Sequence, residues 1–436
     1  MAPRLPTEPP RGMRDILPAE AELRDFAAGT ILGVYRRYGF RRVETPGLEH
    51  LDLLTGGGGG ENEKLIFKVL KRGEKLDLTA AVSEADLADL GLRFDLTVPL
   101  ARYYAHNHAT LPHPLRAVQI GPVWRAERPQ RGRYRQFTQC DIDILGVASE
   151  IAEIELILAT TEALGELGLA GLTVRINDRR VLAAMAAWCG FAAERRASVF
   201  ITLDKWDKLP PSEIRRELEQ AAHPASAIDR LMQLYAGAPG PVDLDAMRAA
   251  LGLSGEDAGF TALTRIVDTV RGESGDRFTI AFDPTLVRGM GYYTGPIFEI
   301  GSSSFAAGSI AGGGRYDDMI GAFLGRPVPA TGFSIGFERV IEILGKSRAQ
   351  GDRADRVAVL FDDAEGGLGR ALRTARELRA QGHLVALERQ ARSLGAQRAA
   401  LEKQGYDGAA MIGVDGVPNV TWFAERKMRR EPESQG

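Results

Sequence analysis

Residues 117–145 read AVQIGPVWRAERPQRGRYRQFTQCDIDIL, and their pattern indicates the architecture of the chain more clearly than any other segment. Two short strands, Ala117–Arg125 and Gln136–Leu145, are predicted to flank a turn rich in arginine, proline and glycine. The second strand alternates, so its side chains point to opposite faces of a sheet in turn. One face carries Phe137, Gln139, Asp141 and Asp143, and the other carries Thr138, Cys140, Ile142 and Ile144. A carboxylate and an amide at alternating positions point into one shared space, which predicts a polar site on the first face.

Helices and further strands are expected around this hairpin. An amphipathic helix is predicted over Ala19–Tyr38 and a second long helix over Ser149–Leu167. The other elements of this part of the chain are expected at Gly39–Pro46, Phe278–Phe282, Tyr292–Ile300 and Phe337–Lys346. Together these segments predict a sheet with helices packed against it.

The chain divides into segments of different character. Residues 179–270 are mostly helical and are interpreted as an inserted helical domain. The domain that contains the hairpin then comprises residues 1–178 and 271–346. A polar run at 347–355 is interpreted as a linker. From 356 to 436, short strands alternate with helices, which predicts a separate α/β domain.

Composition limits the class of protein. Of 436 residues, 44% are hydrophobic and 26% charged, so the chain can bury sizeable cores. No apolar run is long enough for a membrane span, and the N-terminus lacks the apolar region of a secretory signal, so we expect a cytoplasmic protein without a membrane partner. The two cysteines, Cys140 and Cys189, exclude a disulfide framework, and no Cys/His cluster has zinc spacing, so no metal site is predicted.

The net charge of −3 does not by itself indicate a nucleic-acid-binding protein. A nucleic-acid partner would need local basic patches, because phosphate contacts are local electrostatic interactions. The hairpin turn provides such a patch, with Arg125, Arg128, Arg131, Arg133 and Arg135. The glycine run Gly56–Gly60 is not followed by Gly-Lys-Ser/Thr, so a surface loop is favoured over a phosphate-binding P-loop.

Several segments resemble the motifs of the histidyl-tRNA synthetase family of class II synthetases. The helix and strand that end at Pro46 resemble motif 1, Val123–Phe137 resembles motif 2, and Thr331–Arg339 resembles motif 3. Leu286–Gly295 and Ala311–Asp317 resemble the signatures that separate histidyl enzymes from other class II synthetases. The resemblance implies an α+β catalytic domain, with an antiparallel sheet flanked by helices, a helical insertion, and a C-terminal α/β domain similar to the anticodon-binding domain of this subgroup.

The resemblance implies an ATP site with two catalytic arginines. Arg125 would hold the α-phosphate as negative charge builds up there, because a guanidinium stays protonated and offers a planar fork to phosphate oxygens. Arg288 would lie against the same phosphate from the opposite side. Glu127 would accept from the exocyclic amine of adenine, and Arg339 would stack on adenine or hold the γ-phosphate. Mg²⁺ is expected on the phosphates.

A histidine pocket is implied beside the ATP site. The residues implied for it are Asp95, Thr97, Gln139, Asp143, Arg288, Tyr292, Tyr293 and Tyr316. Asp143 would accept from an imidazole N–H, and Tyr293 would contact the ring. A site that pairs both ring nitrogens can reject other side chains by ~10⁴-fold or more.

The α-ammonium group of the substrate would bind at Asp95 and Thr97. We expect the segment Arg93–Pro99 to be a strand, so that these two residues face one side of it. A carboxylate and a hydroxyl suit an ammonium group with three donors, and Gln139 would add an acceptor.

The resemblance implies two macromolecular partners, tRNA(His) and a second copy of the chain. Gln130, Arg131 and Arg133 would reach the acceptor end of the tRNA. Motif 1 forms the dimer interface in this family, which implies a homodimer. The implied reaction is ATP-dependent activation of L-histidine to histidyl-adenylate, followed by transfer to the 3′ end of tRNA(His).

Two departures from the family pattern leave alternatives open. Gly291 stands where the commoner histidyl motif has aspartate, and the C-terminal domain is short after Asn419–Phe423. A paralogue could therefore make histidyl-adenylate and pass it to an acceptor other than tRNA. A histidine-sensing regulatory subunit of ATP phosphoribosyltransferase is a further alternative. Arg125, Arg288 and Arg339 argue against it, because a sensor needs no ATP clamp.

Overall fold

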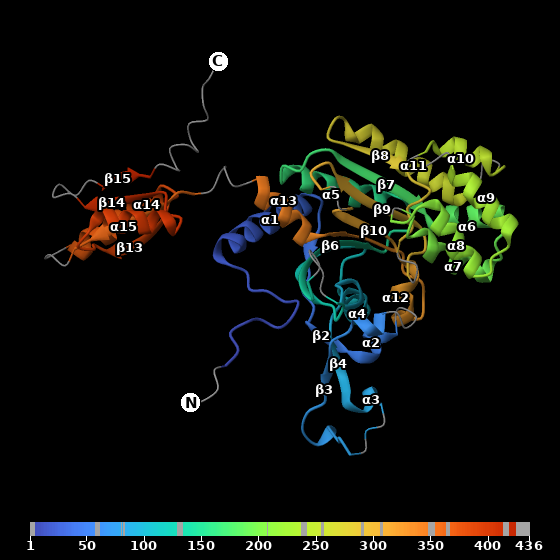
Figure 1. The fold of residues 1–436 in the computed structure, drawn as a ribbon, viewed down its shortest axis with the longest axis horizontal. Helices are drawn as coiled ribbons and strands as arrows, with labels where there is room; N and C mark the ends of the chain where they lie inside the picture. The colour runs from blue at the N-terminus through green and yellow to red at the C-terminus, as the bar shows by residue number, and fades with distance from the viewer. Residues whose placement is uncertain are drawn as a thin grey trace. The chain divides into compact units, whose positions relative to one another are not determined.

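A computed structural model describes residues 5–56, 62–79, 81, 83–128, 134–206, 208–236, 242–253, 257–288, 292–305, 308–347, 354–362, 367–412 and 418–423. The chain forms two compact units, Met1–Gly345 and Lys346–Gly436, each of which contains its own sheet (Figure 1). The predicted tRNA contacts Gln130, Arg131 and Arg133 lie outside the described residues, as do Gly291 and most of the glycine run 56–60.

An eight-stranded sheet forms the centre of the first unit. In spatial order its strands are β1 (Arg41–Arg42), β5 (Leu115–Trp124), β6 (Gln136–Leu145), β11 (Ala330–Ile335), β10 (Ala311–Arg315), β9 (Pro296–Ser302), β7 (Leu172–Asp178) and β8 (Phe278–Phe282). Neighbouring strands are antiparallel except at the two edges, where β1–β5 and β7–β8 are parallel. The predicted sheet is therefore confirmed, with parallel pairs added at its edges.

The two faces of β6 meet different surroundings, as its alternation predicts. Cys140, Ile142 and Ile144 are fully buried in an apolar core that includes residues of α1 (Pro18–Arg37) and α5 (Ile151–Glu166). On the other face, α4 (Thr97–Asn107) and α12 (Asp317–Leu324) pack over a second core with Ala117, Leu145 and Ala330. Helices thus cover both faces, and the polar side chains of β6 lie on the α4 side.

The segment Arg93–Pro99 is a turn that leads into a helix, so its prediction as a strand is wrong. β4 (Ala88–Leu92) ends before it, and α4 begins at Thr97. The Asp95 carboxylate accepts from the backbone N–H of Val98 at 3.2 Å, which satisfies an amide that the first helical turn leaves free. Pro99 is tolerated in that turn because it lacks an N–H.

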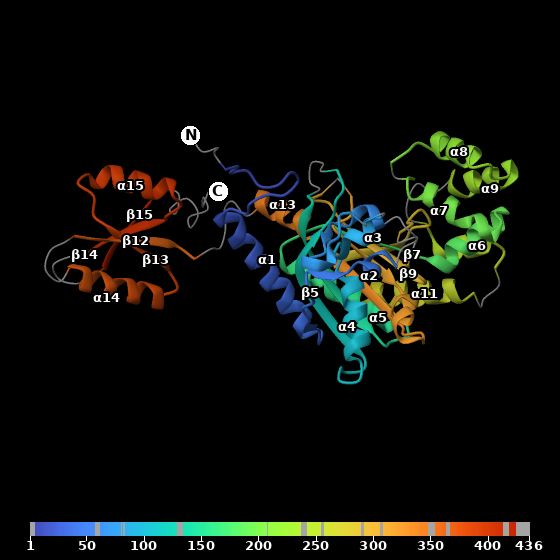
Figure 2. The ribbon, with the colours of Figure 1, turned by 90° about the horizontal axis from the view of Figure 1, so that it is seen from below.

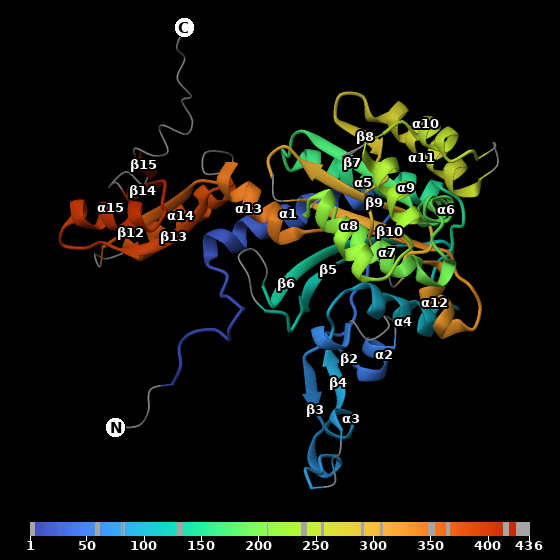
Figure 3. The same ribbon diagram turned by 45° about the vertical axis from the view of Figure 1, so that its right-hand side comes forward.

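A small three-stranded sheet lies at the end of the unit that carries α4. Its strands, in order, are β2 (Leu48–His50), β4 and β3 (Lys68–Leu70), and they are antiparallel. Short helices accompany it: α2 (Leu51–Thr55), α3 (Glu84–Leu87), and the 3₁₀ turns η1 (Asn62–Leu65) and η2 (Gly73–Lys75). Figure 3 shows this sheet projecting from the body of the unit.

The segment between β7 and β8 is helical, as predicted. Its helices are α6 (Arg179–Cys189), α7 (Arg196–Leu203), α8 (Pro211–Gln220), α9 (Ala225–Ala236), α10 (Leu244–Ala250) and α11 (Ala258–Ser274), with the 3₁₀ turn η3 (Ala193–Arg195). Figure 2 shows α6, α7, α8 and α9 gathered to one side of β7 and β9. Leu182 and Leu231 belong to the same apolar core as the sheet residue Ile176, so this segment shares the sheet's core. Its status as a separate domain with bounds 179–270 stays a prediction.

The second unit is an α/β domain, as predicted. Its sheet has the order β13 (Leu384–Arg389), β12 (Arg356–Phe361), β14 (Gly408–Ile412) and β15 (Pro418–Trp422), with β15 antiparallel to β14 and the other pairs parallel. Alternate residues of β12 pack on α14 (Gly367–Ala380) and on the side of α15 (Leu394–Lys403). In the chain, this domain is preceded by α13 (Phe337–Ser347), which follows β11 after a single residue and extends across the boundary between the two units.

Candidate active site

Two adjoining cavities lie on the polar side of the sheet. The inner cavity has a volume of about 290 Å³ and the outer cavity about 500 Å³. Both are close to the roughly 300–1,000 Å³ typical of small-molecule sites. Residues that line both cavities are Arg125, Gln139, Arg288, Gly312 and Ser334. The two arginines that the sequence predicts to act together therefore lie at the boundary between the cavities.

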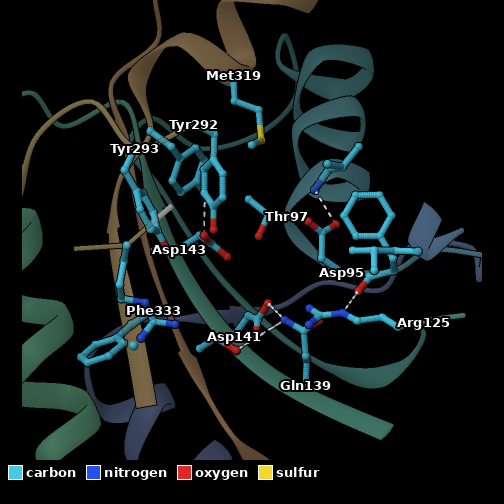
Figure 4. Close-up of a pocket in the computed structure, with 18 residues that line it drawn as sticks. Asp95, Thr97, Arg125, Gln139, Asp141, Asp143, Tyr292, Tyr293, Met319 and Phe333 are labelled. Carbon is cyan, nitrogen blue, oxygen red and sulfur yellow. Dashed lines mark hydrogen bonds between the residues drawn. The ribbon is translucent and has the colours of Figure 1, made fainter. Parts of the chain in front are cut away.

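The inner cavity is lined by three carboxylates and three tyrosines (Figure 4). These residues are Asp95, Asp141, Asp143, Tyr292, Tyr293 and Tyr316. The Tyr316 hydroxyl donates to Asp143 Oδ1 at 2.5 Å. Gly332 of β11 is the cross-strand partner of Asp143, and a Cβ there would lie 2.0 Å from that Oδ1. The lack of a side chain at Gly332 leaves room for the buried carboxylate. A glycine of motif 3 therefore makes space for the side chain of Asp143 on β6.

Burial raises the pKa of all three carboxyl groups in the inner cavity. The pKa of Asp95 rises to about 6 and that of Asp141 to about 7. The pKa of Asp143 rises well above its ordinary value, first through burial and then through the negative charge of Asp141. A cation with N–H donors would favour the charged forms and lower these pKa values. The inner cavity is thus electrostatically suited to a positively charged ligand.

Two buried acceptor atoms of the inner cavity have no hydrogen-bond partner among the residues that the structure describes. Gln139 Oε1 and Asp143 Oδ2 are buried, and neither has a hydrogen-bond donor within the described part of the chain. Such atoms are uncommon in folded proteins, because an unpaired buried acceptor costs about 1–3 kcal/mol. These are the two side chains that the sequence predicts to accept from the ammonium and imidazole groups of the substrate. A ligand with two N–H groups would satisfy both.

Arg125 follows directly after β5 and is held by a carbonyl and a ring. Its Nε donates to Phe94 O at 3.1 Å, and its guanidinium carbon lies 5.1 Å from the centroid of the Phe137 ring. Among the described residues, no carboxylate forms an ion pair with it. The positive charge of Arg125 is therefore left for an anion at the boundary of the cavities.

Arg288 is held by a chain of alternating charges. Its Nη1 donates to Glu299 Oε1 at 2.7 Å. The other oxygen of Glu299 pairs with Arg175 Nη2 at 3.0 Å, and Arg175 Nη1 pairs with the fully buried Asp283 at 3.2 Å. A Cβ on Gly312 would lie 1.7 Å from Arg288 Nη1, so glycine at 312 allows the guanidinium to lie across β10.

The outer cavity contains the predicted nucleotide contacts Glu127 and Arg339. Arg339 lies in the first turn of α13, and its Nη1 donates to the carbonyl oxygen of Ser309. The neighbouring Glu338 accepts from the backbone N–H of Thr138 at 3.0 Å and pairs with Arg24 of α1 at 2.8 Å. These contacts hold the first turn of α13 against β6 and α1.

The structure brings most of the predicted site residues together. Asp95 and Thr97 still line the inner cavity, although they come from a turn and a helix start and not from a strand. Tyr292 and Tyr293 also line it, but they precede β9, which begins at Pro296 and not at Tyr292 as expected.

Asp141, Ser334 and Glu299 contribute to the site, but no role was assigned to them from the sequence. Asp141 and Ser334 line the inner cavity, and Glu299 pairs with Arg288. The two-residue period of β6 did place Asp141 on the polar face, between Gln139 and Asp143, but without a role in binding. No comparable signal pointed to Glu299, because its pairing with Arg288 depends on the fold.

No group of three or more His, Cys, Asp or Glu side chains is arranged to hold a metal ion in the ranges that the structure describes. None of the helices in those ranges has both the length and the apolar character needed to cross a bilayer.

Comparisons with known proteins agree with the motifs. A family model described as histidyl-tRNA synthetase matches residues 12–340. A histidine–tRNA ligase of Leifsonia xyli subsp. xyli is 46% identical over 420 residues, which cover 94% of this chain and 96% of the relative. The crystal structure of a histidyl-tRNA synthetase from Nostoc sp. PCC 7120 superposes with a TM-score of 0.80 at 27% identity, covering 98% of this chain and 100% of that chain.

A second solved structure shares the fold. It is described as an ATP phosphoribosyltransferase regulatory subunit/histidyl-tRNA synthetase from Bacillus halodurans C, with a TM-score of 0.74 at 23% identity, covering 91% of this chain and 97% of that chain. The family assignment itself rests on the family model and on the closely similar full-length relative. These two findings show that the chain belongs to the histidyl-tRNA synthetase family.

Proposed function

We propose that this protein activates L-histidine with ATP and transfers the histidyl group to tRNA(His). The observation that carries the proposal is the position of Arg125 and Arg288 in the wall shared by the two cavities. On one side of them lies a cavity with buried carboxylates and tyrosines, and on the other a cavity with Glu127 and Arg339. An amino acid and a nucleotide bound in these cavities would meet at the two arginines.

The inner cavity would bind histidine with its cationic groups inward. The α-ammonium group would bind Asp95, Thr97 and Gln139, and an imidazole N–H would bind the free Oδ2 of Asp143. Tyr316 holds the other oxygen of Asp143 at 2.5 Å, so the carboxylate is fixed before the ligand arrives. Tyr292 and Tyr293, with ring centroids 4.3 Å apart, would contact the imidazole ring. Such pairing of buried polar groups is a strong basis for specificity.

The first reaction would take place between the arginines. An oxygen of the histidine carboxylate attacks the α-phosphorus of ATP, and the bond from that phosphorus to the pyrophosphate oxygen breaks. Negative charge builds up on the α-phosphate oxygens in the transition state, and fixed cations on both sides stabilise it. Glu127 would bind the adenine amine, and Arg339 would bind the ring or the γ-phosphate.

Mg²⁺ would enter as a counter-ion on the phosphates of ATP. We assign it no protein ligand and no reaction step, because the described residues offer no group of acidic, His or Cys side chains arranged to hold an ion.

The second reaction would transfer the histidyl group to tRNA. A terminal ribose hydroxyl attacks the carbonyl carbon of the adenylate and AMP leaves. Gln130, Arg131 and Arg133 would contact the acceptor end. The helical segment 179–270 and the α/β domain 356–436 would act as an insertion and an anticodon-binding domain, joined by the linker 347–355. A cytoplasmic homodimer, formed through α1 and the strand after it, is the expected assembly.

Pyrophosphate exchange and tRNA charging test this function. We expect histidine-dependent exchange and charging of tRNA(His) by the wild type, and loss of both in Arg288→Ala. Arg271→Ala, which removes an exposed arginine of α11 that lines neither cavity, should retain both activities. Exchange without charging would favour the paralogue with another acceptor. Histidine binding without exchange would favour the regulatory subunit.

A further inference from the structure

Asp141 lines the inner cavity beside Gln139, which lies at the wall between the two cavities. Asp141 is 3% exposed and comes from β6, and its cross-strand partner on β11 is Ser334. The Ser334 hydroxyl donates to Asp141 Oδ1 at 2.5 Å. The Gln139 amide nitrogen donates to the same carboxylate, at 3.1 Å to Oδ2 and 3.4 Å to Oδ1 (Figure 4). One buried carboxylate therefore accepts from two side chains.

This contact determines which end of the Gln139 amide faces the ligand. The two ends of a glutamine amide are nearly alike in shape, but one is a donor and the other an acceptor. An ionised carboxylate only accepts, so above its pKa of about 7 Asp141 selects the orientation in which the NH₂ group faces it, and ligand binding is therefore compared at about pH 8. The oxygen then faces away, and Gln139 Oε1 is the buried atom without a partner among the described residues.

We propose that Asp141 is a positioning residue that orients the Gln139 amide so that its oxygen accepts from the substrate's α-ammonium group. The inference rests on the proposed function, because it takes histidine as the ligand of the inner cavity. With the opposite orientation, the NH₂ group of Gln139 would face the ammonium, two donors would oppose each other, and Oε1 would face a carboxylate. Asp141 thus makes the site selective for a ligand with a cation at this position.

A neutral residue at position 141 would no longer favour one orientation of the Gln139 amide over the other. Asparagine keeps the size of the side chain but offers both a donor and an acceptor, so either orientation of Gln139 finds a partner. We expect Asp141→Asn to weaken binding of ligands with the ammonium group by about 10- to 100-fold, the range for a hydrogen bond to a charged group. Ser334→Ala removes the hydrogen bond that lowers the pKa of Asp141, so less of the carboxyl group is ionised and the same effect is expected with a smaller magnitude.

Three ligands that share the imidazole separate this role from a structural one. L-Histidine has the ammonium and the carboxylate, histamine has only the ammonium, and imidazolepropionate has only the carboxylate. Dissociation constants would be measured by calorimetry on the full-length protein. In Asp141→Asn, histidine and histamine should weaken together, whereas imidazolepropionate should bind as it does to the wild type. In the control Tyr316→Phe, which acts on the imidazole side through Asp143, all three should weaken.

The pattern of dissociation constants decides whether Asp141 has a positioning role or only a structural one. Equal weakening of all three ligands in Asp141→Asn, or no change in any, would overturn the proposal. If Asp141→Asn does not fold, the same comparison with Ser334→Ala decides. A wild-type protein that does not bind histidine would instead contradict the proposed function, independently of the variants.

Discussion

Replacing Gly312 by alanine would displace Arg288 without removing any charged or hydrogen-bonding side chain from the site. A Cβ at 312 would lie 1.7 Å from Arg288 Nη1 and 2.5 Å from its Cζ. An ordinary contact begins near 3.4 Å, so the guanidinium would have to move by about 1.7 Å. That movement also disturbs the 2.7 Å contact with Glu299. The methyl group therefore acts on the position of the proposed catalytic cation.

The size of the effect follows from the displacement. A misplacement of about 1 Å at a catalytic site can cost ~10²-fold in rate, and loss of a pre-organised donor to a developing anion costs ~10²–10³-fold. We expect the turnover number of pyrophosphate exchange to fall by ~10²-fold in Gly312→Ala, by the same reasoning. The KM for histidine should rise by a smaller factor than the turnover number falls, because the ammonium and imidazole contacts are retained and only the contact of the carboxylate with Arg288 is disturbed.

Two further variants make this test decisive. Gly301→Ala adds a methyl group to the neighbouring strand β9, where the nearest atom is 4.0 Å away, so it should retain wild-type exchange. The double variant Gly312→Ala/Arg288→Ala should be no slower than Arg288→Ala alone, since both changes act through one group. Exchange by Gly312→Ala within a few-fold of the wild type would refute the reasoning, and so would additive losses in the double variant.

The other predictions concern the carboxylates of the site and the partner of Arg288. Gly332→Ala places a Cβ 2.0 Å from Asp143 Oδ1, so the KM for histidine should rise by about 10- to 100-fold while the KM for ATP is unchanged, as steady-state exchange kinetics would show. Burial raises the pKa of Asp141 from 3.8 to about 7, so between these pH values the folded state holds a proton that the unfolded chain has released. The stability of the unliganded wild type should therefore fall as pH rises through this window relative to Asp141→Asn, and thermal unfolding at about pH 5 and pH 8 measures the difference. Glu299→Gln removes the charge that holds Arg288 and should lower the turnover number of exchange by roughly 10-fold or more with little change in histidine binding, given ~1.5–3 kcal/mol for a charged hydrogen bond.

The alternation of polar and apolar residues along β6 was sufficient to predict the site residues that this strand contributes. The period of two in β6 separates Gln139 and Asp143 from Cys140 and Ile142, and the structure places the first pair at a cavity and the second in the core. Such a prediction holds because the pleat alone decides which face a residue occupies. The motif resemblance then located Arg288 and Arg339, which come from segments far away in sequence.

The remaining features depend on contacts that no local pattern encodes. The residues around Asp95 alternate like a strand, but the hydrogen bond to Val98 N–H starts a helix instead. β15 was not predicted, because its pairing with β14 depends on a neighbour in the fold. The structure shows that Gly312 and Gly332 make room for protein side chains, which could only be seen once the strand register was known.

The order of charges along the two cavities explains how one substrate orientation would be selected. The inner cavity holds three carboxyl groups whose pKa values are raised first by burial, with the charge of neighbouring carboxylates adding to the rise at Asp141 and Asp143. Arg125 and Arg288 lie at its outer wall. A zwitterionic amino acid with a second N–H group matches this order only with its ammonium and imidazole groups inward and its carboxylate at the arginines. That orientation delivers the reacting oxygen to the boundary where an α-phosphate from the outer cavity would lie. The same electrostatic gradient that binds the substrate would therefore also align it for attack, and a ligand of reversed polarity would meet like charges at both ends.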